Sequence, residues 1–205
     1  MDTDLFANGR DPSTYVSGLR NYRSFVRALA DEAAAYLPRN GAEYVDRLAA
    51  AAAGPTAPLR ATMMTEDWCG DSACNLPIIG ALMDGAGIDF RVMRGSENEG
   101  LRDYYRDRGD VHIPVVSVWD REFDEIACWV EAPQTMNERK NAWKAANPKF
   151  AELHQRQHED RRSAREFAVI YRDFLEAMAA WYRDGMWLET ARELVEAVEK
   201  AGSGR

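Results

Sequence analysis

The stretch TEDWCGDSACNLP, residues 65–77, decides the fold of this chain. It places Cys69 in a short loop, with an extended segment before it and a helical segment after it. The extended segment, LRATMMT at residues 59–65, is short, apolar and preceded by proline, which predicts a strand. The segment SACNLPIIGALMDGAG at residues 72–87 predicts a helix closed by glycine. The sequence therefore predicts a cysteine between a strand and the start of a helix.

This position has chemical consequences for the thiol of Cys69. The first N–H groups of a helix are unpaired and its dipole is positive there, and both favour thiolate, the nucleophilic form. Ser72 or Asp71 can cap the helix, and the Ser72 hydroxyl can also donate a hydrogen bond to the sulfur. Negative charge on Glu66, Asp67 and Asp71 acts in the opposite direction, because it raises the pKa of a nearby thiol.

Further strands and helices follow at regular intervals. Strands are predicted at residues 88–93, 113–119 and 125–130, and a helix with Ser96 as its N-cap is predicted at 96–109. The first two strands are separated by a helix, which favours parallel pairing, and the last two are close enough for an antiparallel hairpin. The order strand, helix, strand, helix, strand, strand indicates an α/β mixed sheet flanked by helices.

The chain of 205 residues is interpreted as a single domain, 1–205, with three parts. Helical spacing predicts an N-terminal helical extension at 12–54, interrupted near Gly41, and a C-terminal helical extension at 133–202. The mixed sheet occupies the core at 58–132.

Charge and composition exclude several classes of function. The formal net charge is -8, so we expect no nucleic acid and no membrane surface among the partners. No export signal or apolar span is evident, and three cysteines without a repeating pattern do not form a disulfide framework, which together predict a cytoplasmic protein. His154 and His158 are spaced as zinc ligands can be, but no third ligand accompanies them, so we expect no metal and no cofactor.

The chain resembles the thioredoxin family. The resemblance rests on DWCGDS at 67–72, on Pro77 eight residues after Cys69, and on IPVV at 113–116. Together with WLETARELV at 187–195, these motifs are similar to those of bacterial thioredoxin-like proteins with helical extensions.

The resemblance implies roles for particular residues. Cys69 matches the attacking cysteine of the family, Ser72 takes the place of the resolving cysteine, and Pro114 matches the proline whose peptide bond is cis and faces the thiol. These three are the predicted catalytic residues. The predicted substrate-binding residues are Trp68, Gly70, Asp71 and Ile113, with the backbone of Ile113 pairing with an extended substrate.

Two departures from the family pattern bear on activity. Ser72 removes the second thiol, and Met63 stands where the family commonly has a buried acid that assists that thiol. A single thiol can attack a disulfide but cannot release itself from the mixed disulfide. Cys74 lies about 140° around the helix from Cys69, and both Cys74 and Cys128 are interpreted as core residues.

Two functions remain open on these grounds. The first is thiol–disulfide exchange through one exposed thiol, Cys69, less acidic than in a typical thioredoxin-like site, with protein or small-molecule thiols and disulfides as partners. The alternative is a redox-inactive interaction module that uses its extensions, including Trp181 and Trp187, to bind a partner or a second copy as a homodimer. A single-cysteine cluster carrier is a third reading, for which no glutathione pocket is identified.

Overall fold

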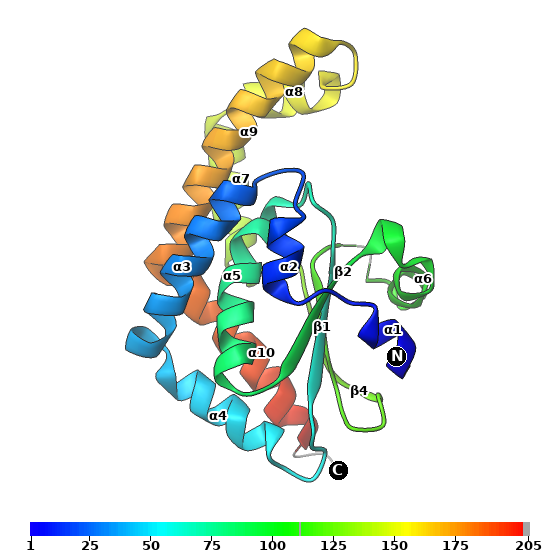
Figure 1. The fold of residues 1–205 in the computed structure, drawn as a ribbon. Helices are drawn as coiled ribbons and strands as arrows, with labels where there is room; N and C mark the ends of the chain where they lie inside the picture. The colour runs from blue at the N-terminus through cyan, green and yellow to red at the C-terminus, as the bar shows by residue number, and fades with distance from the viewer. Residues whose placement is uncertain (111, 203–205) are drawn as a thin grey trace. The chain divides into compact units, whose positions relative to one another are not determined.

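A computed structural model describes residues 1–110 and 112–202. These residues form a four-stranded sheet in the order β2-β1-β3-β4 (Figure 1). The strands are β1 (Arg60–Thr65), β2 (Asp89–Arg94), β3 (Val115–Trp119) and β4 (Glu125–Val130). β1 and β2 pair in parallel, whereas β1 with β3 and β3 with β4 are antiparallel. The predicted order of strands, the parallel first pair and the final hairpin are confirmed.

Ten α-helices occur in the described part of the chain. They are α1 (Thr3–Ala7), α2 (Pro12–Ser17), α3 (Arg23–Asn40), α4 (Ala42–Ala52), α5 (Gly70–Gly85), α6 (Glu99–Asp107), α7 (Met136–Ala146), α8 (Lys149–Arg156), α9 (Arg161–Trp181) and α10 (Trp187–Gly202). The predicted break near Gly41 is present. A second break lies between α2 and α3, where Tyr22 adopts φ 59°, a left-handed conformation that a helix cannot continue through.

The sheet is covered on both faces, because successive side chains of each strand point to opposite sides. Helices α3, α4, α5 and α10 lie on one side and α1 and α6 on the other (Figure 1). Met63 faces the first group, and Met64 packs into a separate core with Leu101 and Tyr105 of α6.

Trp187 anchors α10 within this arrangement. Its indole is 1% exposed and donates a hydrogen bond of 3.0 Å to the carbonyl of Cys74 in α5. Its ring also meets Tyr36 of α3, with the two ring centroids 5.4 Å apart. Trp187 is therefore a packing residue and has no surface to offer a partner, which corrects its place in the interaction-module hypothesis.

The start of α6 differs from the prediction. Ser96 does not cap this helix, which begins at Glu99 after a short 3-10 turn, Gly95–Glu97, with Asn98 at the cap position. Ser96 instead bonds the carboxylate of Glu66 through its N–H and its hydroxyl. The N–H and hydroxyl of Ser96, which a capping box would use within the helix, therefore donate to Glu66 instead.

The chain divides into two compact units. One is Met1–Ala132 together with the chain from Trp187 onward, and the other is Pro133–Met186. The second unit contains α7, α8 and α9, and it is held by an aromatic cluster of Trp143, Phe150, Phe167, Tyr171 and Phe174. Among the described helices none is long and apolar enough to cross a membrane.

Candidate functional site

Cys69 lies at the N-terminus of α5, two residues before Asp71 and three before Ser72, the two predicted caps. It is the N-cap residue itself: its carbonyl accepts the first helical bond from Ala73, and its Sγ accepts the N–H of Ser72 at 3.4 Å. Neither Ser72 nor Asp71 is the cap, because both already belong to the first turn. The thiol therefore sits where unpaired helical N–H groups converge.

The side chain of Cys69 is buried, so the prediction of an exposed thiol is wrong. The residue is 6% exposed. Residues of α2 and of the link between α2 and α3 cover it: Tyr15, Leu19 and Tyr22 line, together with Cys69, a space of about 10 Å³, which is too small for any substrate. We call residues 15–22 the cover segment. It comes from the N-terminal extension, which motif spacing alone does not place.

Burial also controls the acidity of the thiol. Desolvation raises the pKa of Cys69 to about 11, and the charge of Asp71 adds to this, while hydrogen bonds from Ser72 act in the opposite direction. The prediction of a weakly acidic thiol is confirmed in direction. The principal cause is burial under the cover segment, however, and the neighbouring acids contribute less.

Ser72 is placed between the strand and the thiol. Its hydroxyl is buried and accepts a hydrogen bond from the hydroxyl of Thr65 at the end of β1. A serine oxygen that accepts in this way keeps its own proton for another acceptor. The side-chain hydrogen bond of Ser72 that lowers the pKa of Cys69 fits this arrangement.

The Ile113–Pro114 peptide bond is cis, as the resemblance implied, and it lies beside the thiol. The Sγ of Cys69 donates to the carbonyl of Ile113 at 3.4 Å. Pro114 is buried, and its carbonyl accepts the N–H of Glu131 at 2.7 Å. The carbonyl of Ile113 thus faces the sulfur, at the position where a substrate backbone is expected.

The remaining predicted substrate-binding residues differ in exposure. Trp68 is 61% exposed, so its indole offers an apolar surface on the loop between β1 and α5. Gly70 is buried at the start of α5, and Asp71 is half-buried.

The other two cysteines and Met63 have no part in the site. Met63 and Cys74 are both 0% exposed, as expected for core residues. Cys128 is half-buried in β4, and burial raises its pKa to about 11. All three cysteines are free thiols. The described residues contain no group of three His, Cys, Asp or Glu side chains that could hold a metal ion.

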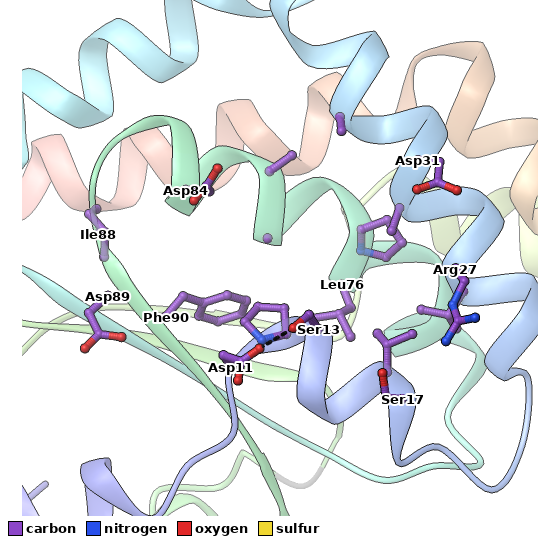
Figure 2. Close-up of a pocket in the computed structure, with 18 residues that line it drawn as sticks. Asp11, Ser13, Ser17, Arg27, Asp31, Leu76, Asp84, Ile88, Asp89 and Phe90 are labelled. Carbon is purple, nitrogen blue, oxygen red and sulfur yellow. Dashed lines mark hydrogen bonds between the residues drawn. The ribbon is translucent and has the colours of Figure 1, made fainter.

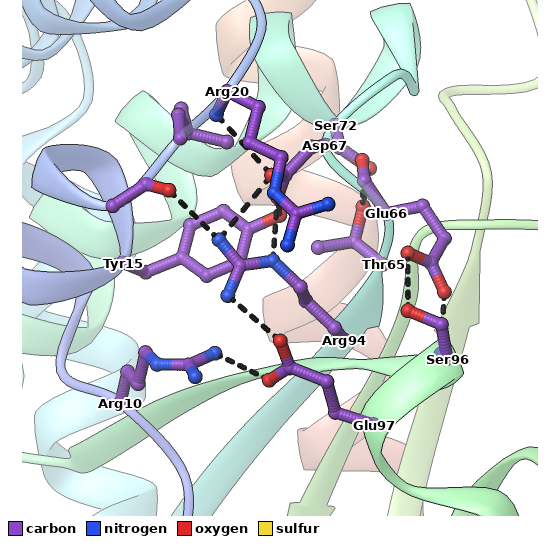
Figure 3. Close-up of polar contacts among 12 residues, drawn as sticks. Arg10, Tyr15, Arg20, Thr65, Glu66, Asp67, Ser72, Arg94, Ser96 and Glu97 are labelled. Atoms are coloured by element: carbon purple, nitrogen blue, oxygen red, sulfur yellow. Dashed lines mark hydrogen bonds and ion pairs between the residues drawn. The ribbon is translucent and has the colours of Figure 1, made fainter.

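An ion-pair network fixes the loop before Cys69, and motif reasoning did not identify it (Figure 3). Asp67 accepts from Arg94 Nε at 2.7 Å and Nη2 at 3.3 Å. The same carboxylate accepts from the Tyr15 hydroxyl and the Arg20 N–H, each at 3.2 Å. Asp67 therefore joins the end of β2 to the cover segment.

Arg94 is the centre of this network. It is 9% exposed, and it also donates to the carbonyl of Gly18 at 3.1 Å and pairs with Glu97, which in turn pairs with Arg10. Burial raises the pKa of Asp67, but the bonds from Arg94 and Arg20 outweigh it and the pKa is lowered.

A signal for this contact was present in the predicted topology. Parallel strands end at the same edge of a sheet, and Arg94 is the partner of Thr65 in the β1–β2 register. A cation at that position must therefore lie beside the loop that follows Thr65, which carries Glu66 and Asp67.

Comparison with known proteins agrees with this geometry. A family model described as thioredoxin matches residues 37–144. A crystal structure of a protein of unknown function, PA1234 from Pseudomonas aeruginosa, is similar with a TM-score of 0.60 and 20% identity, covering 96% of each chain. An HIV epitope-scaffold is similar with a TM-score of 0.59 and 17% identity, again covering 96% of each chain.

At these identities the two structures bear on the fold alone. A comparison with curated proteins found no match. The matched family model spans more than half of the chain. It includes β1, the loop that carries Cys69, and β3, which follows the cis proline, so this chain belongs to the thioredoxin family.

Proposed function

We propose that the protein carries out thiol–disulfide exchange through Cys69 alone, on protein or small-molecule disulfides. The Cys69 thiolate attacks one sulfur of the substrate disulfide, the substrate S–S bond breaks, and the other sulfur leaves as a thiolate. A second, external thiolate then attacks the mixed disulfide and restores the Cys69 thiolate. No net oxidation occurs, and the external thiol takes the place of a resolving cysteine.

One observation carries this proposal. Cys69 caps α5 with its sulfur 3.4 Å from both the Ser72 N–H and the Ile113 carbonyl. The helix N-terminus stabilises a thiolate, and Ser72 can donate to it without resolving a mixed disulfide. A carbonyl beside the sulfur suits a substrate backbone in extended form.

The buried state sets a condition on this activity. With a pKa of about 11, only about one Cys69 in 10⁴ is ionised at pH 7. Displacement of the cover segment would rehydrate the sulfur, lower its pKa and admit a disulfide. We therefore expect exchange to proceed from an open form. A reducing cytoplasm would supply the external thiol.

A second function is favoured by the same burial. The thiol of Cys69 is buried, Ser72 stands where the family has its resolving cysteine, and Met63 stands where it has a buried acid. These are properties of a redox-inactive interaction module. Trp68, exposed beside the loop, would be its apolar contact with a protein partner or a second copy.

An exchange assay separates the two functions. A peptide–glutathione mixed disulfide is incubated with reduced glutathione and with wild type, Cys69→Ser or Cys128→Ser. Exchange through Cys69 requires wild type and Cys128→Ser to release the peptide thiol faster than the uncatalysed control, while Cys69→Ser matches that control. Equal rates for wild type and Cys69→Ser would exclude the exchange function and leave the interaction module.

A further inference from the structure

A large hollow lies beside the covered thiol and is separate from it. Its volume is about 670 Å³, and it lies between α2, α3, α5 and the start of β2 (Figure 2). This volume is within the range of small-molecule sites. Val26 and Leu76 line both this cavity and the small space at Cys69, so the two hollows are neighbours. Thiol–disulfide exchange at Cys69 makes no use of the larger cavity.

The cavity combines an apolar wall with an acidic rim. The apolar side chains include Pro12, Val16, Val26, Leu76, Ile88 and Phe90. Four carboxylates also line it, at Asp11, Asp31, Asp84 and Asp89, against a single cation, Arg27. Figure 2 shows these charged groups spread around the apolar side chains.

The carboxylates differ in how far their charge is already compensated. Asp89 is paired with Arg91 at 2.9 Å. Hydrogen bonds from Ser13 and Thr14 hold the pKa of Asp11 well below its usual range, so it is ionised at neutral pH. Asp31 and Asp84 have no ion pair with any described residue. Several negative charges are therefore available to a ligand.

Gly80 indicates that the space is not simply poor packing. It lies inside α5, where glycine is unfavourable relative to alanine. A Cβ at Gly80 would meet nothing nearer than Pro12 at 3.9 Å, whereas a Cβ at Gly85 would meet Val45 at 2.9 Å. Close packing explains the glycine at Gly85 and does not explain Gly80. A larger side chain at Gly80 would project into the cavity, so the glycine keeps it open.

We infer that this cavity binds a small amphipathic cation, a molecule with an apolar body and an ammonium group. The apolar body is desolvated against Val16, Leu76 and Phe90, and the ammonium group faces the carboxylates of the rim. Charge complementarity selects the cation over a neutral or anionic molecule of the same shape, since the carboxylates of the rim would repel an anion. The inference is independent of the chemistry at Cys69.

Three matched probes test the inference by isothermal titration calorimetry: phenylbutylamine, phenylbutanol and phenylbutyrate. The wild-type protein is expected to bind the amine about tenfold more tightly than the alcohol, and the acid more weakly than either. The preference for the amine should fall as salt is added, because the rim is open to solvent. Equal affinity for amine and alcohol, or no binding of the amine, would overturn the inference.

Two sets of variants locate the site. Gly80→Leu should abolish binding of the amine, and Gly80→Ala, which leaves most of the space, should retain it. Asp31→Asn combined with Asp84→Asn should reduce the preference for amine over alcohol while alcohol binding persists, and this readout does not depend on whether Gly80→Leu folds. Unchanged amine binding in a folded Gly80→Leu, or an unchanged preference in the Asp31/Asp84 double variant, would place the ligand elsewhere and refute the assignment.

Discussion

Arg94 and Asp67 form a forked ion pair that connects the end of β2 to the loop before Cys69. Both side chains are nearly buried, at 11% and 10% exposed. Asp67 also accepts hydrogen bonds from the Tyr15 hydroxyl and the Arg20 N–H, both in the cover segment. One ion pair therefore holds both the loop that carries Cys69 and the chain that closes over it.

The variant Arg94→Met should expose Cys69. It removes the bonds to Asp67 and to the Gly18 carbonyl, leaving a nearly buried carboxylate without its cation, which we expect to destabilise the fold by about 3 kcal/mol. The cover segment then opens more often, and alkylation of Cys69 at pH 8 should accelerate about tenfold or more. Mass spectrometry of iodoacetamide-treated protein measures this rate for each cysteine separately.

Two controls distinguish local opening from general unfolding. Cys74 is 0% exposed in α5 and should remain unmodified while Cys69 reacts. Arg106→Met removes an arginine that is 58% exposed and should leave the rate at Cys69 unchanged. Parallel acceleration at Cys69 and Cys74 would show that Arg94 stabilises the whole fold rather than the cover segment.

The pH dependence of Cys69 alkylation should follow its raised pKa. Burial disfavours the thiolate, so the reaction rate is expected to keep rising with pH to a midpoint of about 11. Asp71→Asn removes a nearby negative charge and should move that midpoint downward. A wild-type midpoint near or below pH 8 would mean that the helix N-terminus dominates over burial, contrary to a closed site at Cys69.

Ser72→Ala should make the thiol still less acidic. The substitution removes the side-chain hydrogen bond that lowers the pKa of Cys69, and it leaves the Thr65 hydroxyl with the more distant Glu66 carbonyl, at 3.4 Å, in place of its close acceptor Ser72. We expect a higher alkylation midpoint and a loss of about 1–2 kcal/mol in the free energy of unfolding. Thr65→Val with Ser72→Ala should recover part of that stability, because no buried hydroxyl is then left with only a long hydrogen bond. An unchanged midpoint in Ser72→Ala would show that Ser72 does not donate to the sulfur.

The sheet and the position of Cys69 could be predicted because the signals are local. The apolar run at 59–65, the glycines at the end of α5 and the short link between β3 and β4 each report on their own segment. The cis peptide bond before Pro114 was predicted from the resemblance of the IPVV motif, and the structure confirms it.

The cover segment could not be predicted in this way. It depends on contacts between Tyr15 and Asp67, 52 residues apart, and between Arg20 and Asp67, 47 residues apart. Helical periodicity gives the apolar face of an N-terminal segment but not the surface it packs on. For this reason the predicted exposure of Cys69 was wrong. The position of Arg94, the cation of the ion-pair network around Asp67, does follow from the register of β1 and β2.

Gly80→Ala should stabilise the protein, since the added methyl group meets no atom closer than 3.9 Å and alanine is the better helix former. We expect a gain of about 0.5–1 kcal/mol in the free energy of unfolding, measured by urea denaturation. Gly85→Ala is the matched comparison in the same helix, and the contact of its Cβ with Val45 at 2.9 Å should cancel the gain. If Gly80→Ala instead destabilises the protein, the glycine is required by packing, and the argument that it holds the cavity open for a ligand loses its basis.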